Sequence, residues 1–299
     1  MMAIQKPDWF DTLLDWLAPV TVHTRSLVFD FGDTRNVPED WEMSTLRGVW
    51  GNALHEIDLR LYDAVFQGPG GKTNRQPLYS VREDLDSAGR PRRLQPWERS
   101  LQWSVFCLPD SLDEPLLEAW DLACRDGIGR NRNTCEISHV ETYSCELLDP
   151  AFIRAAQPCR LVFIQPLRLI KKDAMNPNPT LRDIVLATLT RLGFLRAVAL
   201  SDDRENLVFP PGPSRLHPDF APEILDYADT IPGEPWTGIT NSLDRYSGRQ
   251  KKTISLKGTS GMLTFPQGLG ALAPLMAAAS TTHLGKGSVY GMGRPFLLW

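Results

Sequence analysis

The sequence predicts an α+β protein made of two units, and three observations support this. Segments with the helical period alternate with segments rich in β-branched and aromatic residues. The chain has 299 residues, and at roughly 100–200 residues per domain it fits one large domain or two medium ones. Pro150 and Pro158 flank the expected boundary. We therefore predict an N-terminal domain over 1–157 and a C-terminal domain over 158–299.

In the first unit, apolar positions repeat with the helical period in some segments, while others favour strands. The predicted elements are a helix over 8–18, a strand over 19–31, a helix from Ser44 or Thr45 to about Phe66, a loop over 67–77, a strand over 100–109, a helix from Ser111 to Gly127 and a β-like segment over 133–148. The loop contains GPGGKT, but it lacks the first glycine of a P-loop and no helix follows its lysine. After the first helix, the predicted order of elements is therefore β, α, β, α, β.

The second unit shows the same alternation. Its predicted elements are a strand over 160–170 interrupted by Pro166, a helix over 180–195, a proline-rich loop over 201–219, a short helix near 221–228, a hairpin over 245–265, a helix over 269–281, a glycine-rich loop and a last strand, PFLLW. A proline inside a strand marks an edge or a bulge. Both halves fit the split β-α-β plan, so we predict two tandem ferredoxin-like, RRM-like domains.

The charge of the chain is unevenly divided. The net charge is −4, but residues 1–155 hold 16 Lys and Arg against 25 Asp and Glu, whereas residues 156–299 hold 16 against 11. Such a split is a recognised hint of a polyanion bound by one part of a protein. An acidic half can equally be a solvated surface, so charge alone leaves both interpretations open.

Several classes of protein are disfavoured. No run approaches ~18 apolar residues, the length of a membrane-spanning helix, and the N-terminus carries acids where a signal peptide is basic. We expect a cytoplasmic protein that does not bind a membrane. The five cysteines form no C-x-x-C pair and no histidine pair has ligand spacing, so reduced thiols are expected and no metal or cofactor is predicted.

The C-terminal stretch HLGKGSVYGMGR is the most informative motif. Gly285, Gly287, Gly291 and Gly293 are interspersed with Lys286 and Arg294. Glycine lets successive backbone N–H groups approach an anion, so such a loop can bind phosphate. The order helix, glycines, strand disfavours a dinucleotide site, which needs a strand before the loop and a helix after it. A tight crossover from helix to strand is the structural alternative.

The segment RYSGRQKKTISLK is strongly basic. It contains Arg245, Arg249, Lys251, Lys252 and Lys257 around an aromatic residue, and it has no acid. A basic hairpin of this kind suits the backbone of RNA or DNA. The alternative is an ordinary solvated hairpin.

Taken together, these residues resemble a known family. The glycine-rich motif after a C-terminal helix, preceded by the basic hairpin, is similar to the signature of the RAMP superfamily and, within it, of the CRISPR repeat-RNA processing endoribonucleases. The stretches IQPLRLIK, STLRGVWGNALHEI and LYDAVFQGP also resemble segments of these enzymes. The middle of the chain, 81–159, matches only by the order of its elements.

The resemblance implies a metal-independent endoribonuclease that binds the stem-loop of a CRISPR repeat. In such enzymes the ribose 2′-OH attacks the adjacent phosphate and leaves a 2′,3′-cyclic phosphate and a 5′-OH. The implied partners are the repeat RNA or mature crRNA and other subunits of an effector complex. The alternative is a non-catalytic RAMP subunit that binds the crRNA handle and scaffolds a surveillance complex.

The resemblance also points to candidate catalytic residues. A catalytic histidine of the family commonly lies in or beside the first helix of the first domain, where this chain has His55. His23, on the first strand, and His283, beside the glycine loop, are rivals. Arg47, two helical turns before His55, joins the predicted RNA-binding residues, and a histidine can serve in either proton-transfer role.

Overall fold

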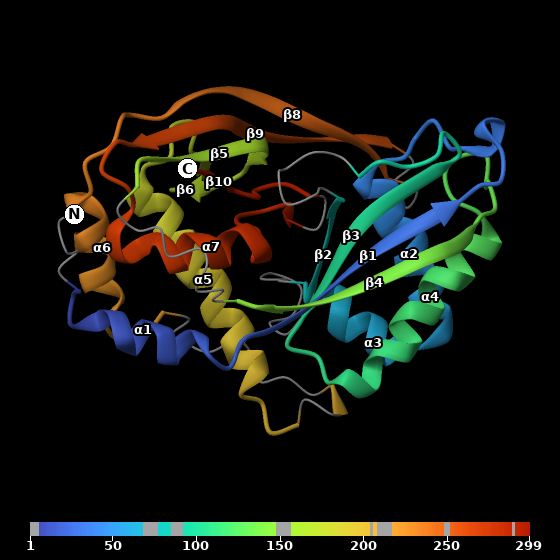
Figure 1. The fold of residues 1–299 in the computed structure, drawn as a ribbon, viewed down its shortest axis with the longest axis horizontal. Coiled ribbons are helices and arrows are strands. Elements are labelled where there is room, and N and C mark those ends of the chain that lie inside the picture. Colours follow the sequence, from blue (N-terminus) through green and yellow to red (C-terminus); the bar gives the residue numbers. More distant parts are fainter. Residues whose placement is uncertain are drawn as a thin grey trace. The chain divides into compact units, whose positions relative to one another are not determined.

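The computed structural model describes residues 6–67, 77–84, 92–147, 157–203, 206–207, 217–247, 252–288 and 291–299. The chain forms two compact units, each discontinuous in sequence (Figure 1). Unit 1 comprises residues 1–20, 146–197 and 213–299, and unit 2 comprises 21–145 and 198–212. The sequence analysis predicted one boundary between residues 157 and 158. In the structure, residues 1–20 belong to the unit that holds the C-terminal half, and residues 198–212 belong to the other unit.

Unit 2 is an antiparallel sheet with its helices on one face (Figure 1). Its elements are β1 (Thr21–Asp30), α2 (Met43–Ile57), α3 (Leu59–Tyr62), β2 (Tyr79–Glu83), β3 (Glu98–Phe106), α4 (Asp113–Asp126) and β4 (Glu136–Glu146). The strand order is β2-β3-β1-β4. This order, with helices after the first and third strands, is the ferredoxin-like arrangement and confirms the predicted fold. Strand β2 was not predicted.

Aromatic side chains join the helices of unit 2 to the sheet. Trp50 of α2 stacks on Trp120 of α4 with ring centroids 5.6 Å apart, and it meets Trp103 of β3 edge-on at 5.2 Å. All three side chains are fully buried. Because large aromatic residues bury the most apolar area, this cluster is the centre of the unit 2 core.

The predicted helix from residue 44 to 66 is interrupted at Asp58. This residue adopts an extended conformation, with φ −150° and ψ 102°, and its side chain accepts hydrogen bonds from the N–H groups of Arg60 and Leu61. An aspartate that caps new N–H groups starts a second helix. The chain then continues as α3 and a π-helical turn over Asp63–Gln67.

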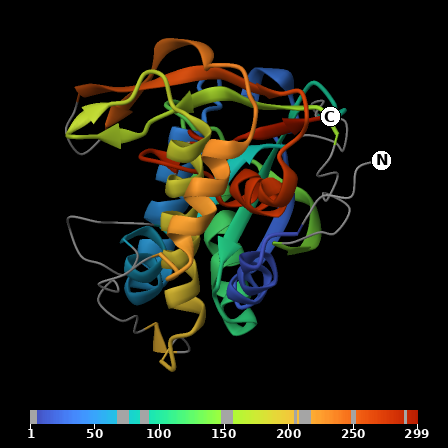
Figure 2. The same cartoon turned by 90° about the vertical axis from the view of Figure 1, so that its left-hand side faces the viewer.

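Unit 1 repeats the same arrangement. Its elements are α1 (Trp9–Leu17), β5 (Cys159–Leu167), β6 (Ile170–Lys171), β7 (Ala174–Met175), α5 (Leu181–Ala199), α6 (Ala221–Thr230), β8 (Thr237–Ser247), β9 (Lys252–Phe265), α7 (Ala273–Thr282) and β10 (Phe296–Leu298). The order of the large sheet is β10-β5-β9-β8. Helices α5, α6 and α7 lie on one side of it (Figures 1 and 2). The unit is therefore a second ferredoxin-like domain.

Strand β5 carries a bulge at the predicted proline. Its pairing with β9 shifts between Phe163 and Leu167, so the chain around Pro166 leaves the regular ladder. Proline has no N–H to donate, and bulges are among the few places where a sheet tolerates it. The bulge confirms one of the two expectations for this residue and positions the candidate site described below.

The N-terminal helix α1 packs within unit 1, although β1 of unit 2 follows it directly. Trp9 contacts Tyr227 of α6 edge-on at 5.4 Å, and Arg196 donates a hydrogen bond to the carbonyl oxygen of Trp16 at 3.0 Å. The buried face consists of Trp9, Leu13 and Leu17, the spacing expected of an amphipathic helix.

Cys107, Cys124, Cys135 and Cys159 are buried free thiols, as predicted for these four. Burial raises the pKa of Cys159 to about 11, so this thiol stays protonated at neutral pH. The fifth cysteine lies where side chains are not described. Within the described ranges, the helices are too short or too polar to cross a bilayer.

Candidate nucleic-acid interface

The glycine-rich loop of unit 1 rests on the bulge of β5. The carbonyl oxygen of Pro166 accepts a hydrogen bond from Gly293 N at 3.0 Å, and that of Arg168 accepts one from Lys286 N at 3.0 Å. Pro166 lies where the pairing with β9 shifts, and Arg168 follows the end of β5, so both carbonyls lie outside the β ladder and pair with the loop instead. The loop is thereby fixed to the sheet at two points.

Two glycines are required by this close packing. A Cβ at Gly293 would lie 2.0 Å from the carbonyl oxygen of Leu284, and one at Gly285 would lie 2.5 Å from that of Arg168. Both residues also have a φ near +70°, which L side chains rarely adopt. These positions serve the tight crossover from α7 to β10 that was the structural alternative.

Several N–H groups of the loop are already used by the protein. Leu284 N donates to the carbonyl oxygen of Gly293, and Gly291 N donates to that of Ser288, at 2.9 and 3.1 Å. With the N–H groups of Lys286 and Gly293 paired to the bulge, these four donors are not available to a phosphate. RNA contact by the loop stays a prediction, including the contacts predicted for Gly285, Gly287, Gly291 and Gly293. The side chains of Lys286 and Arg294 are better candidates for binding phosphate than the N–H groups of the loop.

Arg168 connects the loop to the basic hairpin, and the sequence analysis missed it. Its guanidinium donates a hydrogen bond to the carbonyl oxygen of Lys257 at 2.7 Å, while its own carbonyl holds Lys286. The side chains of Lys257 and Lys286 are exposed. One residue beside the bulge therefore contacts the backbone of two predicted RNA-binding lysines. Arg294 lies nearby in sequence, with its guanidinium 4.5 Å from the ring centre of Phe296.

The rest of the basic hairpin can be placed only in part. Arg249 and Lys251 lie outside the described residues, and the side chains of Arg245 and Lys252 are not described. Their backbones are in the β8–β9 ladder, where Arg245 pairs with Ile254 and Lys252 with Ser247. A hairpin is present as predicted, but its first strand begins at Thr237, eight residues before the predicted start at Arg245. Its RNA-binding role stays a prediction.

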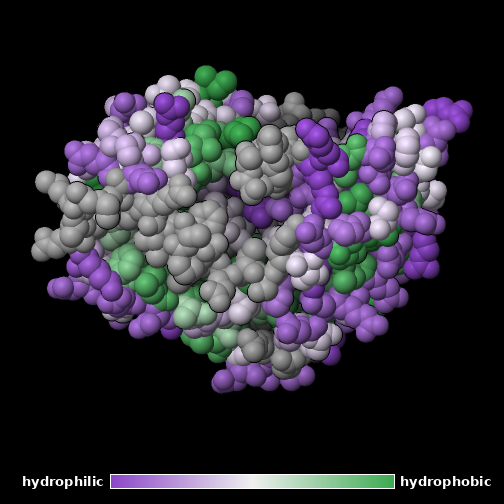
Figure 3. All heavy atoms as spheres, viewed as in Figure 1, coloured by the Kyte–Doolittle hydropathy of each residue, from purple (hydrophilic) through white to green (hydrophobic). Residues whose placement is uncertain are grey.

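The face of the unit 1 sheet opposite the helices carries apolar side chains. Ile164 is 64% exposed and Ile239 is 69% exposed, and Met262 lies between β5 and β8 on the same face. Figure 3 shows hydrophobic side chains in green along this upper part of the unit, among hydrophilic ones. This sheet face therefore presents exposed apolar side chains.

Unit 2 presents a second candidate surface on α2. His55 is exposed and meets the Tyr62 ring edge-on at 5.1 Å, and Tyr62 stacks on Phe66 at 4.8 Å. The Arg47 guanidinium lies 5.2 Å from the centre of the Phe66 ring. Arg47 and His55 are thus joined through two aromatic rings, which we call the α2 cluster. Tyr62 was not among the predicted site residues.

The α2 cluster depends on Gly51. This glycine lies one turn from both Arg47 and His55, and a Cβ there would be 2.7 Å from Cε1 of Phe66. The missing side chain lets the Phe66 ring lie directly against the helix. The row Arg47, Gly51 and His55 at i, i+4, i+8 is therefore one continuous face, as the sequence predicted.

The rival histidines are less accessible. His283 is fully buried at the end of α7, with φ +57° and its N–H bonded to the carbonyl oxygen of Ala279 at 3.0 Å. His23 is half-buried on β1, with Nε2 3.4 Å from Oδ1 of Asp110. A general acid or base must reach the reacting atoms. Of the three predicted candidates, His55 is therefore the best placed.

Among the described residues, one group could hold a metal ion. Ligand atoms of His23, Asp110 and Asp113 lie within 4.8 Å of one another. However, Asp113 already forms an ion pair with the buried guanidinium of Arg25, which would repel a bound cation. The arrangement is better explained as an ion-pair network at the N-terminus of α4, where acids are favourable.

Known proteins resemble this chain in sequence and in fold. Residues 161–295 match the family model of CRISPR-associated endoribonuclease Cas6. This part of the chain is therefore similar to a Cas6 endoribonuclease domain. The match spans β5, the β8–β9 hairpin and the glycine loop, which are the elements that carry the resemblance noted in the sequence. No curated protein matches the chain.

Solved Cas6 structures share the fold across both units. A Cas6 product complex superposes with a TM-score of 0.56 at 17% identity, covering 93% of this chain and 99% of that one. Thermus thermophilus Cas6 gives a TM-score of 0.54 at 13% identity, with coverage of 93% and 99%. A partial Cas6-RT-Cas1–Cas2 complex gives 0.54 at 8% identity, with 93% of this chain and 46% of that one covered. At these identities, the likeness establishes a common Cas6-type fold.

Proposed function

We propose that this Cas6-type protein is an endoribonuclease that binds the stem-loop of a CRISPR repeat RNA and cleaves the precursor. The observation that carries the proposal is the α2 cluster, where an exposed histidine is held against a tyrosine and joined to an arginine. The Cas6 family match and the exposed lysines near the glycine loop support RNA as the substrate.

The proposed reaction is an internal transfer that needs only protein side chains. The ribose 2′-OH loses its proton and its oxygen attacks the adjacent phosphorus. The bond to the 5′-oxygen breaks, and that oxygen takes up a proton. The products are a 2′,3′-cyclic phosphate and a 5′-OH. His55 acts in one of the two proton transfers, Tyr62 orients it, and Arg47 stabilises the charge that develops on the phosphate oxygens.

The test is single-turnover cleavage of a repeat stem-loop in the presence of EDTA. We expect the wild type to cut, and the 5′ fragment to end in a cyclic phosphate identified by mass spectrometry. His55→Ala should slow cleavage by roughly 10²- to 10⁴-fold, the usual contribution of a general acid or base. RNA affinity should stay nearly intact, because the change removes no phosphate-binding lysine.

A matched control uses another exposed histidine of unit 2. His139 lies on β4, 4.0 Å from Glu141, and it is outside the α2 cluster. His139→Ala should cut as the wild type does. If both variants cut normally, His55 has no catalytic role. If the wild type binds the repeat RNA but never cuts it, the chain is instead a scaffold subunit that retains crRNA in an effector complex.

A further inference from the structure

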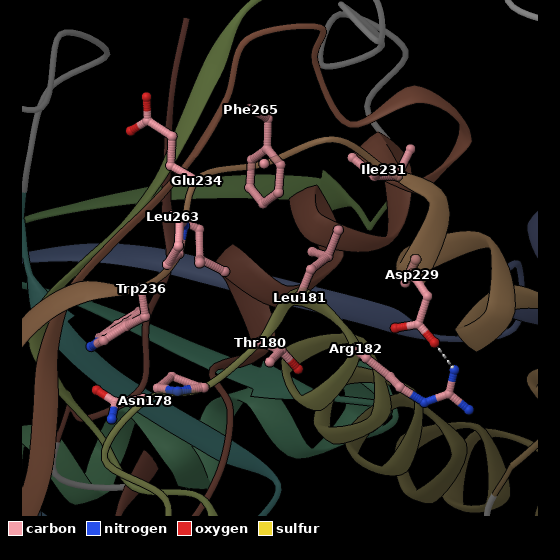
Figure 4. Close-up of a pocket in the computed structure, with 14 residues that line it drawn as sticks. Asn178, Thr180, Leu181, Arg182, Asp229, Ile231, Glu234, Trp236, Leu263 and Phe265 are labelled. Atoms are coloured by element: carbon pink, nitrogen blue, oxygen red, sulfur yellow. Dashed lines mark hydrogen bonds and ion pairs between the residues drawn. The ribbon is translucent and has the colours of Figure 1, made fainter.

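Unit 1 contains a cavity of about 620 Å³ that none of the predicted RNA-binding residues lines. It lies between the first turn of α5, the end of α6 and strand β9 (Figure 4). Figure 4 shows Phe265 and Leu181 pointing toward its centre, with Trp236 on one side and Asp229 on the other. Its interior is therefore largely apolar and aromatic, and a carboxylate lies at its margin.

Three glycines shape the aromatic wall of this cavity. A Cβ at Gly233 would lie 2.9 Å from the Phe265 ring, so its absence lets the chain cross that ring closely. Gly238 and Gly261 are paired across β8 and β9, and a Cβ on either would lie within 3 Å of the Trp236 indole. Trp236 thus fits into a space that side chains at these positions would fill, and it forms a fixed wall.

The margin of the cavity is acidic. Arg182 of α5 forms ion pairs with both Asp226 and Asp229 of α6, at 3.2 and 2.5 Å. One guanidinium thus faces two carboxylates, which leaves one negative charge unbalanced. Both aspartates are more than half exposed. Of the acids in this region, Asp229 and Glu234 line the cavity, whereas Asp226 and the exposed Glu223 lie on α6 outside its lining.

The sequence around the cavity strengthens this charge. From His217 to Asp244 there is no lysine or arginine, although the C-terminal half of the chain is otherwise basic. Phosphate would be repelled here, because like charges oppose binding and the single arginine is already paired. The surface is therefore complementary to a cationic partner that also has apolar side chains.

We propose that this cavity is a docking site for a segment of a partner protein in which an arginine or lysine follows an apolar side chain. The apolar side chain enters between Leu181, Phe265 and Trp236. The cation contacts the carboxylate of Asp229 at the margin and that of Asp226, which pairs with the same arginine. This interaction is independent of the proposed cleavage, because it uses neither the α2 cluster nor the lysines near the glycine loop.

The experiment measures fluorescence anisotropy of a labelled peptide with the full-length protein. The probe is fluorescein-labelled Gly-Leu-Arg-Leu-Arg-Gly, and its partner probe has glutamate in place of each arginine. We expect the arginine peptide to bind and the glutamate peptide not to bind. Asp226→Asn with Asp229→Asn should weaken binding about five-fold, since exposed ion pairs contribute modestly. Trp236→Ala should weaken it by about ten-fold or more, as expected when an anchoring wall is lost.

A matched control neutralises two acids at the same spacing elsewhere. Glu118→Gln with Asp121→Asn changes two exposed acids on α4 of unit 2 and should leave peptide binding unchanged. Cleavage of repeat RNA should be unchanged in both double variants. A failure of cleavage in the wild type would therefore refute the proposed function and leave the docking site standing.

Three results would overturn the docking site. The first is equal binding of the arginine and glutamate peptides to the wild type, or equal binding of the arginine peptide to the wild type and to the α6 double variant, Asp226→Asn with Asp229→Asn. The second is displacement of the peptide by repeat RNA, together with a loss of RNA affinity in Trp236→Ala, which would make the cavity a nucleic-acid site. The third is a dimer in light scattering that the α6 double variant dissociates, which would make the occupant a second copy of this chain.

Discussion

Two glycines on helix α2 should respond in opposite ways to the same substitution. A Cβ at Gly48 would meet nothing within 4 Å, whereas a Cβ at Gly51 would lie 2.7 and 2.8 Å from two atoms of the Phe66 ring. Glycine in a helix interior costs about 0.5–1 kcal/mol relative to alanine. Gly48→Ala should therefore stabilise unit 2 by about that amount.

Gly51→Ala gains the same helical propensity but must displace the Phe66 ring. Forcing a methyl group into a packed site costs about 1–3 kcal/mol. Because the propensity gain is common to both variants, their free energies of unfolding should differ by about 1–3 kcal/mol, with Gly51→Ala the less stable. The displaced ring should also disturb Tyr62 and His55, so cleavage should slow in this variant and stay normal in Gly48→Ala.

The assay combines urea unfolding followed by circular dichroism with hydrogen exchange of the α2 amides. Exchange reports the local stability of this helix even if the two units unfold in separate steps. Equal stabilisation of both variants would show that the Phe66 ring moves freely, which would refute the packing argument. A destabilised Gly51→Ala with a normal cleavage rate would show that this ring does not position His55.

Three further predictions concern unit 1. Lys257→Ala with Lys286→Ala should weaken binding of repeat RNA. It should also lower the slope of log affinity against log salt by about 1.4, at ~0.7 per single-strand phosphate contact. Lys171→Ala should change neither quantity in the same titration, because the ammonium of Lys171 is paired with Asp183 at 3.0 Å. Gly293→Ala should lower the melting temperature in differential scanning fluorimetry far more than Gly32→Ala of unit 2, because both have φ near +70° but only Gly293 has an atom within 4 Å of the new Cβ. The pKa of Asp183 is lowered: burial alone would raise it, but hydrogen bonds from Thr180 and Lys171 outweigh burial. Its stabilising effect should therefore be full above its unfolded pKa and lost as pH falls through the lower folded pKa, so the stability difference between wild type and Asp183→Asn in urea unfolding should shrink below about pH 3.8.

Much of the architecture could be predicted because it depends on local patterns. Ser111 and Gly127 predicted the ends of α4 to within two residues, and Pro166 predicted an edge or a bulge where β5 has a bulge. Strand β2 was missed, and it is only five residues long. The break at Asp58 was missed because the helical period continues across it, and only the side-chain cap shows that a new helix begins.

The candidate site was predicted less completely, because its residues meet through tertiary contacts. Lys257, Lys286 and His55 were identified from motifs. Arg168 was not, because nothing in the local sequence shows that a bulge turns its carbonyl toward one lysine and its guanidinium toward the other. Tyr62 was overlooked because the break at Asp58 sets its position relative to His55. The burial of His283 could not be read from a sequence in which glycines and cations surround it.

The placement of α1 has a consequence for the order in which the chain can fold during synthesis. Trp9, Leu13 and Leu17 leave the ribosome before Tyr227, against which Trp9 packs and which is made more than two hundred residues later. Most of unit 2 is complete by residue 145 and can collapse earlier. Until the C-terminal half emerges, the apolar face of α1 stays uncovered, which makes it a target for chaperones. For the same reason, a fragment that begins at residue 158 would lack its α1 and expose Tyr227.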